Sequence, residues 1–352
     1  MTQSGHRAVL NEADPSRYDI FVEQGEGMRR REFIQLLAGV AMVGPLPAHG
    51  QTPKPRRIGY LSPRSSLSAS DRAFLQGLRD VGYVEGSNIL IEFRFADGKF
   101  ERLPALAAEL VQLDVDVIVT AVTQASLAAK ASTKTIPIVM LAVGDPVGSG
   151  LIASIARPDA NVTGTSAMSS EVIGKTLELL KEVVPRLSLV AVLWNPANAT
   201  FQGQLLREAE VAAGALGLEL RKFEARGGEE LNSAFAAIVG VKADALLVLP
   251  DATLLEHRAQ VIALASRNRL IVVYGQKDDV AAGGLMSYGP DMASQYRHGA
   301  TYVDRILKGA MPRDLPVQQP TKFELAVNLK AAKSLGISIP LPLLLRADEL
   351  IE

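Results

Sequence analysis

Polar and turn-forming residues follow the apolar stretches in both halves of the sequence, where predicted strands end. Hydroxyls, amides and helix N-termini can bind a carboxylate, an aspartate can neutralise an ammonium group, and a tyrosine ring can stack on a flat ligand. This combination predicts a binding site for a small polar solute. We expect the ligand-binding residues to be Ser62, Ser65, Ser66, Thr123, Gln124, Asp145, Asn195, Asn198, Thr200, Asp251, Tyr274 and Tyr288.

Several of these residues also have a purely structural interpretation. Asp145 is of a type preferred at helix N-caps, and the pairs Asn195-Pro196 and Pro250-Asp251 are typical of turns. Tyr274 is equally suited to the core of a lobe interface. The argument for binding is that the polar residues share one position, the carboxyl ends of strands, in both halves.

Catalysis and metal binding have few residues available. The 352-residue chain has no cysteine and four histidines, of which His6 and His49 precede the predicted mature domain. Disulfides, thiolate zinc sites and cysteine nucleophiles are therefore excluded, and a Ser-His-Asp triad has little to draw on. We expect no catalytic residue, no metal and no cofactor. The net charge of −1 provides no strong field that would attract nucleic acid or an anionic membrane.

The stretch 136–150, IPIVMLAVGDPVGSG, is the element around which the expected site is built. Its apolar run 138–143 is typical of a strand buried on both faces of a parallel sheet. Asp145 and Pro146 are preferred at the N-cap and first position of a helix, so we expect a helix to begin near Pro146. Small molecules bind at such strand ends in open α/β sheets, which makes this edge one expected wall of a ligand cleft.

Strand and helix patterns alternate along the mature chain, first over 57–157 and again over 170–282. This alternation predicts an α/β fold with two Rossmann-like, flavodoxin-like lobes, each built on a parallel sheet. Short extended segments at 161–166 and 285–288 are the expected crossings between the lobes, and a helix over 292–308 should return to the first lobe. The predicted N-terminal lobe is 51–163 plus 289–352, which includes the C-terminal tail, and the predicted C-terminal lobe is 164–288.

The N-terminal region has the three parts of a bacterial export signal at residues 28–50. Arginines 29–31 form a basic head, 33–46 is mostly apolar, and Ala48-His49-Gly50 offers small residues for cleavage. Arg30 to Ile34 resembles the twin-arginine motif, and the Sec pathway remains an equal alternative. No cysteine follows the cleavage site, so the chain is not a lipoprotein. We expect a periplasmic protein, with residues 1–27 as a disordered extension or the result of a wrong start before Met28.

Four phrases of the sequence resemble one known family. They are MRRREFIQLLAG, IVMLAVGDPVGSGLIASIARPDANVTG, PTKFELAVNLKAAKSLGISIP and LLLRADELIE, and they occur in order across both halves. The chain resembles the ABC-transporter substrate-binding proteins of the tryptophan/tyrosine type. The resemblance implies a type I periplasmic-binding-protein architecture, no catalysis, a small-molecule solute that can be an amino acid, and an ABC permease as partner. It also implies that Asp145 and the turns at Thr123 and Asn195 form walls of the cleft.

Three functional hypotheses follow from these observations. The first is a monomeric extracytoplasmic receptor of an ABC importer, which closes on a small polar solute between its lobes and binds no nucleic acid. The second is a two-lobed enzyme that uses cleft carboxylates, with Asp145 facing Asp251. The third is the ligand-binding subunit of an extracytoplasmic sensor, which would have the same sequence features as the first.

Overall fold

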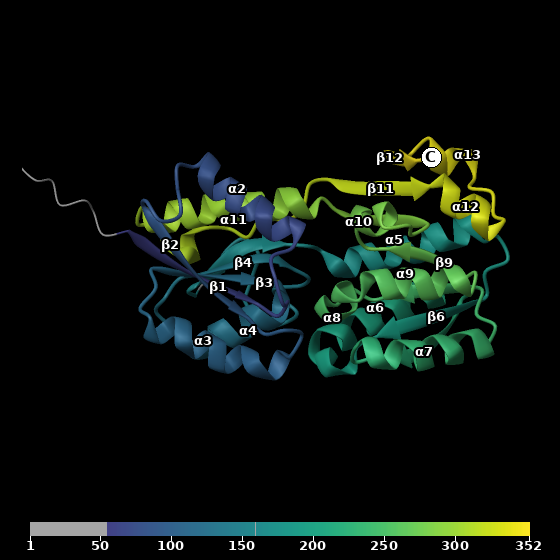
Figure 1. The fold of residues 1–352 in the computed structure, drawn as a ribbon, viewed down its shortest axis with the longest axis horizontal. Coiled ribbons are helices and arrows are strands. Elements are labelled where there is room, and N and C mark those ends of the chain that lie inside the picture. Colours follow the sequence, from purple (N-terminus) through teal and green to yellow (C-terminus); the bar gives the residue numbers. More distant parts are fainter. Residues whose placement is uncertain (1–54, 159) are drawn as a thin grey trace, which may run out of the picture. The chain divides into compact units, whose positions relative to one another are not determined.

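The first lobe is built on a parallel sheet of five strands (Figure 1). The computed structural model describes residues 55–158 and 160–352. The strand order is β2-β1-β3-β4-β5, so the chain starts inside the sheet and adds strands on both sides. The strands are β1 (Arg56–Ser62), β2 (Ile89–Phe95), β3 (Val117–Ala121), β4 (Ile138–Val143) and β5 (Val162–Ser166).

Helices cover both faces of this sheet, as its apolar strands require. On one face, Phe74 of α2 and Tyr296 of α11 pack against Val119, whereas the neighbouring Ile118 packs with α3 and α4 on the other face. This alternation along one strand explains why β3 is buried at every position. The helices are α2 (Ala69–Asp80), α3 (Leu103–Gln112), α4 (Val122–Ser132) and α11 (Met292–Leu307), with the short turn η1 (Phe100–Arg102) before α3.

The second lobe is built on a sheet of seven strands in the order β12-β11-β10-β9-β8-β6-β7. Every pairing is parallel except that of β10 with β11, which is antiparallel. The strands are β6 (Leu189–Trp194), β7 (Glu219–Glu224), β8 (Ala245–Val248), β9 (Ile271–Tyr274), β10 (Met286–Pro290), β11 (Phe323–Asn328) and β12 (Glu349–Ile351).

The helices of the second lobe again lie on both faces of its sheet. Leu177 and Leu205 belong to one core, which includes α5, α6 and α12, and Phe235 and Val261 belong to the opposite core, which includes α7 and α9. The helices are α5 (Ser169–Val183), α6 (Ala199–Leu216), α7 (Gly228–Gly240), α8 (Ala252–Glu256), α9 (Arg258–Arg267), α10 (Lys277–Ala281), α12 (Leu329–Leu335) and α13 (Leu341–Leu344). Two short turns, η2 (Pro196–Asn198) and η3 (Pro312–Asp314), complete the list of elements.

The predicted fold class is confirmed, because each of the two lobes has an α/β sheet with helices on both faces. The helix expected to begin near Pro146 is absent, and that prediction was wrong. Asp145 Oδ1 does cap the backbone, accepting hydrogen bonds from the N–H of Val147 at 3.0 Å and of Gly148 at 2.8 Å. Residues 146–150 nevertheless form turns, and Gly150 has a φ of +73°, a conformation that ends helical structure.

The boundaries between the lobes differ from those expected from the sequence. The segments 161–166 and 285–288 are not simple crossings, because they contain buried strands, β5 and β10. Helix α11 does return to the first lobe, but residues 323–352 then cross a third time, and β11 and β12 pair in the second sheet. The sequence analysis placed this tail in the N-terminal lobe, because an extended pattern does not indicate which sheet a strand will join.

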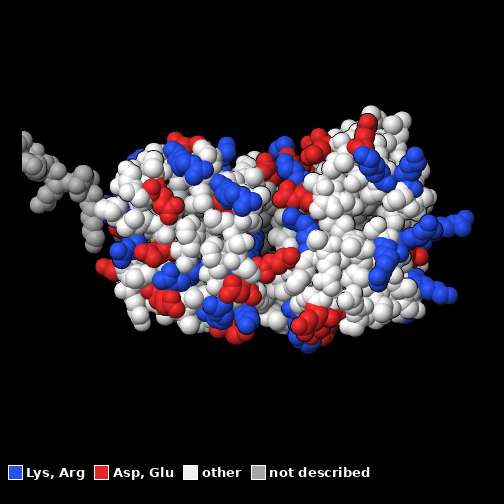
Figure 2. Space-filling view, in the orientation of Figure 1, with Lys and Arg blue, Asp and Glu red and all other residues white. Residues whose placement is uncertain are grey.

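The predicted extension 1–27 and export signal 28–50 lie outside the described residues. Among residues 55–158 and 160–352, no helix has the length and hydrophobicity that crossing a bilayer requires. On the face seen in Figure 2, basic and acidic side chains are interspersed, and the surface is hollowed near its middle. The interspersed charges agree with the net charge of −1.

Asp244 holds the start of β6 and gives the fold a testable pH dependence. Its Oδ2 accepts hydrogen bonds of 2.9 Å from the N–H of Leu189, the N–H of Ser188 and the hydroxyl of Ser188. The bond from the Leu189 N–H, followed by that from Ser188, lowers the pKa of Asp244 below its ordinary value of 3.8. A lowered pKa in the folded state contributes stability above the unfolded pKa, and this contribution is lost as the pH falls through the folded pKa.

We therefore expect Asp244→Asn to lower the free energy of unfolding at pH 7, with a difference from wild type that shrinks as the pH falls below about 4. Urea unfolding measured from pH 7 to pH 3 tests this. The exposed Glu208 of α6 provides a control, and Glu208→Gln should leave the curve unchanged. A difference for Asp244→Asn that stays constant over this pH range would contradict the role of the charge.

Candidate functional site

A cavity of about 150 Å³ is lined by residues from both lobes. In the first lobe, the lining comes from the ends of β1, β3 and β4 and includes Arg64, Thr123 and Ala142. In the second lobe, it comes from the ends of β8 and β9, including Asp251 and Tyr274. Carboxyl ends of parallel strands are where open α/β sheets bind small molecules, and the cavity occupies this position in both lobes.

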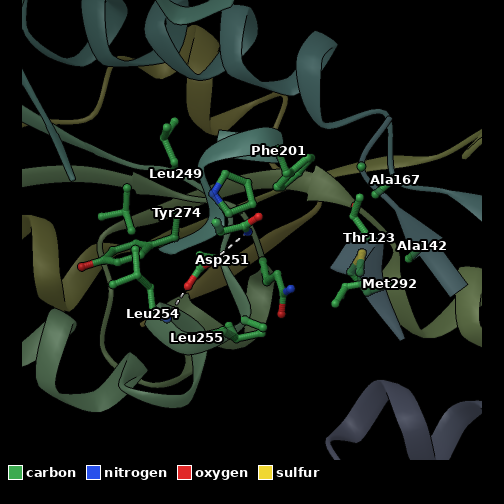
Figure 3. Close-up of a pocket in the computed structure, with 18 of the residues that line it drawn as sticks. Thr123, Ala142, Ala167, Phe201, Leu249, Asp251, Leu254, Leu255, Tyr274 and Met292 are labelled. Carbon is green, nitrogen blue, oxygen red and sulfur yellow. Dashed lines mark hydrogen bonds between the residues drawn. The ribbon is translucent and has the colours of Figure 1, made fainter. Parts of the chain in front are cut away.

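Most of the cavity wall is apolar. Figure 3 shows Leu254, Leu255 and Tyr274 in one part of the pocket, Ala142, Ala167 and Met292 in another, and Phe201 between them. The phenol of Tyr274 is almost fully buried, and burial, followed by the charge of Asp279, raises its pKa. The side chain therefore stays neutral at physiological pH, and its ring belongs both to the cavity wall and to the apolar core of the second lobe.

Asp251 is the best-held polar group of the wall. Its Oδ1 accepts from Asn195 Nδ2 at 3.0 Å and from the N–H groups of Thr253 at 2.9 Å and Leu254 at 3.1 Å. Its Oδ2 accepts one bond, from Asn198 Nδ2 at 3.0 Å (Figure 3). The carboxylate thus accepts four hydrogen bonds, three at Oδ1 and one at Oδ2, so Oδ2 is the less crowded of its two oxygens.

A second acidic group of the wall, Asp279, is paired inside the protein. Arg258 Nε donates to its Oδ1 at 2.5 Å, and Arg258 Nη2 donates to Gln276 Oε1 at 3.0 Å. Burial raises the pKa of Asp279, and the charge of Arg258 opposes that shift. The ion pair therefore adds no net charge to the cavity.

Arg64 brings a cation to the first-lobe side of the cavity. Its Nη1 lies 3.4 Å from Asp71 Oδ1 and 3.5 Å from the hydroxyl of Tyr296, and its side chain is 8% exposed. The hydroxyl of Tyr60 donates to the same oxygen of Asp71. Burial lowers the pKa of Arg64, but Tyr296 and Asp71 together raise it by more, so the guanidinium stays charged.

The backbone is strained where the first lobe meets the cavity. Val122 has a φ of +62° and Ala142 a φ of +48°, and both residues line the cavity. Non-glycine residues rarely adopt this left-handed region, and the cost is greatest for a β-branched side chain such as valine. Strain of this kind costs roughly 1–3 kcal/mol per residue and concentrates at functional sites. The observation supports a functional role for this cavity.

Five of the twelve residues expected from the sequence line the cavity: Thr123, Gln124, Asn198, Asp251 and Tyr274. Two others lie behind it. Asn195 is buried and donates to Asp251, and the hydroxyl of Ser62 accepts from the N–H of Arg64 at 3.2 Å. These two residues hold the wall without being part of the cavity lining.

The remaining expected residues lie elsewhere in the described part of the chain. Ser65 donates through its N–H, at 2.6 Å, and its hydroxyl to Glu256 of α8, and Ser66 is exposed. Asp145 accepts from Gln204 of α6 and is not part of the cavity lining. Thr200 belongs to α6, and its side chain is not among those described. Tyr288 stacks on Phe323 with ring centroids 5.8 Å apart, in the core of the second lobe.

Sequence reasoning missed Arg64, Phe201, Arg258, Gln276 and Asp279, all of which line the cavity. The sequence could have indicated Arg64, because it is the single charged residue of the loop 62–66. The expected site included only the serines of this loop. Arg258 and Asp279 had no such indication, since they lie on helices several residues beyond the strand ends. Among the described residues, no group of three or more His, Asp or Glu side chains could hold a metal ion.

Comparison with known proteins agrees with this architecture. Residues 63–351 match the family model of ABC transporter substrate binding proteins, which is most of the chain. The chain belongs to this family. The family consists of solute-binding proteins, and solved periplasmic binding proteins that are 14% identical to the chain, with TM-scores of 0.52 and 0.54, share its type I fold.

Relatives of this substrate-binding protein include two that are described by their ligands. A tyrosine-binding protein from Clostridioides difficile is 31% identical over 283 residues, which are 80% of each chain. A conserved domain protein from Vibrio cholerae is 31% identical, covers 84% of this chain and all of its own, and has a TM-score of 0.80. An ABC domain from Streptococcus pneumoniae, solved in complex with L-Trp, is 26% identical, covers 85% of this chain and all of its own, and has a TM-score of 0.76.

Proposed function

We propose that this substrate-binding protein binds an L-amino acid with an apolar or aromatic side chain. The observation that carries this proposal is a largely apolar cavity whose charged lining residues are two arginines, Arg64 and Arg258, and two aspartates, Asp251 and Asp279. Their formal charges cancel, which suits a zwitterion with no net charge. The less crowded oxygen of Asp251, Oδ2, which accepts one hydrogen bond, is suited to an ammonium group.

The ligands of two relatives support the same chemical class. One relative is described as tyrosine-binding and another was solved with L-Trp. Tyr274, which was expected from the sequence, and Phe201, which was not, supply aromatic surface to the cavity. In this proposal the two rings contact the side chain of an amino acid whose ammonium group is held at Asp251.

Isothermal titration of the purified full-length chain with L-tyrosine, L-tryptophan, L-phenylalanine, L-leucine, L-glutamate and D-ribose tests this proposal. We expect saturable one-to-one binding of at least one of the first four, and none of L-glutamate or D-ribose. A ligand at 100 times its Kd should also stabilise the fold by about 2.7 kcal/mol, which thermal unfolding detects. Binding of D-ribose, or of none of the amino acids by a folded sample, would contradict the proposal.

The proposal extends to import across the inner membrane. The family assigns the protein to an ABC transporter, and the N-terminal sequence has the parts of an export signal. In this role the lobes would close on the amino acid and deliver it to a permease, with closure driven by contacts that exist in the closed state alone. Fractionation of cells that produce the full-length chain tests whether it reaches the periplasm.

A further inference from the structure

The guanidinium of Arg64 has hydrogen-bonding capacity that the protein does not use. Arg64 Nε is buried, and it has no hydrogen-bond partner among the described residues. The side chain as a whole is 8% exposed. Its Nη1 makes two contacts at the long end of the hydrogen-bond range, 3.4 Å to Asp71 and 3.5 Å to Tyr296. A buried donor without a partner costs about 1–3 kcal/mol, and more on a charged group, so a partner is expected.

Asp71 does not satisfy all the hydrogen-bond donors of the Arg64 guanidinium. The Asp71 carboxylate also accepts from the hydroxyl of Tyr60 and from the N–H of Ser68 at 2.6 Å, within the cap of α2. The other cavity arginine is better satisfied, because Arg258 makes a 2.5 Å ion pair with Asp279 and a second bond to Gln276. Of the two cations in the lining, Arg64 is therefore the one suited to an external anion.

Two further donor groups lie in the same part of the wall. Helix α4 begins at Val122 without a side-chain cap, and its first residues, Val122, Thr123 and Gln124, line the cavity. Uncapped N–H groups at a helix N-terminus attract anions. Gln124 Nε2 is also buried and has no partner among the described residues. An anion placed here would meet a guanidinium, an amide and the start of a helix.

We propose that Arg64 binds the carboxylate of the amino-acid ligand, together with the N-terminus of α4, and that Asp71 positions the guanidinium. This inference rests on the proposed function, which it deepens by assigning the two ends of the zwitterion to different lobes. The carboxylate lies at the first lobe, against Arg64, and the ammonium lies at the second lobe, against Asp251. A ligand must carry both charges at amino-acid spacing to satisfy both lobes.

Asp71, Tyr60 and Tyr296 form the frame that holds Arg64. Burial, followed by the charge of Asp71, raises the pKa of Tyr60, so its hydroxyl remains a donor to Asp71. Tyr296 belongs to α11, the helix that returns from the second lobe and packs on the first sheet. The frame thus connects the carboxylate site to a helix that lies next to a crossing between the lobes.

The test compares two ligands in several variants of the full-length chain. L-Tyrosine and L-tyrosinamide differ in the charge of the carboxyl group, so the ratio of their affinities isolates the contribution of that charge; L-tryptophan and L-tryptophanamide provide a second pair. In wild type, we expect the acid to bind about 10- to 100-fold more tightly than the amide, the range of a charge-assisted hydrogen bond. In Arg64→Met, the ratio should fall to about 1, mainly because the acid binds more weakly.

Two more variants separate binding from positioning. Arg64→Lys retains the charge without the fork of donors and should give an intermediate ratio. Asp71→Asn should also lower the ratio, because the guanidinium loses its charged support while Arg64 remains. Arg72 of α2 is exposed and makes one bond, to the carbonyl of Leu67, so Arg72→Met is the matched control and should keep the wild-type ratio.

The outcomes distinguish this inference from the function on which it rests. If wild type binds none of L-tyrosine, L-tryptophan, L-phenylalanine and L-leucine, the proposed function fails, and the inference fails with it. If it binds phenylalanine or leucine alone, that amino acid and its amide replace the two pairs. If wild type binds tyrosine or tryptophan but binds the matching amide equally tightly, the proposed function stands and the Arg64 inference is overturned. This outcome uses wild type alone, so it does not depend on whether a variant folds. An unchanged ratio in folded Arg64→Met would overturn it in the same way.

Discussion

Asp251→Asn is expected to weaken the binding of a zwitterionic amino acid by about 100-fold, or about 3 kcal/mol. Three donors converge on Oδ1, from Asn195, Thr253 and Leu254, so the amide oxygen of the variant would take that position. The amide nitrogen would then occupy the place of Oδ2, beside Asn198. It would present N–H groups to the ligand's ammonium, replacing an attraction with a repulsion.

Titration with L-tyrosine and with 3-(4-hydroxyphenyl)propanoate, which lacks the ammonium group, separates the charge effect from a loss of fold. Wild type should prefer tyrosine, and the preference should disappear in Asp251→Asn. Asp291, which caps α11 by accepting from the N–H of Ser294 at 2.9 Å and does not line the cavity, is the matched control. Full affinity for tyrosine in Asp251→Asn would show that the ammonium lies elsewhere.

Gly164→Ala is expected to destabilise the fold by more than about 3 kcal/mol. Gly164 lies in β5 with a φ of +135°, and an added Cβ would stand 2.0 Å from the carbonyl oxygen of Met140 and 2.7 Å from its nitrogen. Both atoms belong to the backbone of the neighbouring strand β4, so no side chain can move aside. The carbonyl of Gly164 also accepts from the N–H of Gln318, which ties the third crossing to this strand.

Urea unfolding measures this effect directly, and Gly214→Ala in α6 is its control. A Cβ on Gly214 would meet nothing within 4 Å, and the residue is exposed and helical. That substitution should stabilise the protein by about 0.5–1 kcal/mol, because alanine loses less conformational freedom on folding than glycine. Gly164→Ala with an unchanged unfolding midpoint would show that β4 and β5 can separate at this point without cost.

Local patterns predicted the elements of this fold well, because each depends on residues close in sequence. The apolar run 138–143 matched β4 with the observed bounds, and the helix expected over 292–308 matched α11 within one residue. The error at Pro146 arose from reading the start of a helix without its continuation, where Gly148 and Gly150 favour turns. The sheet that β11 would join depends on tertiary packing, which apolar alternation does not encode.

The candidate site was predictable in its position and less so in its members. Polar and turn-forming residues after an apolar run indicate the end of a strand. Thr123, Asn198, Asp251 and Tyr274 were predicted in this way, and all four line the cavity. Asp145 has the same local pattern but bonds to Gln204 outside the cavity lining. Orientation of a side chain toward or away from a cavity depends on neighbours far along the chain, as the link between Arg64 and Tyr296 illustrates.

The return of α11 to the first sheet, and of β11 and β12 to the second, has a consequence for dissecting the molecule into fragments. Residues 55–166 expressed alone would leave one sheet face partly bare, because α11 supplies Tyr296, Ala300 and Val303 to its covering. Residues 169–290 alone would end at β10 with a free edge, a template for association with other chains. A usable second-lobe fragment should therefore be a splice that joins 290 to 323 through a short linker.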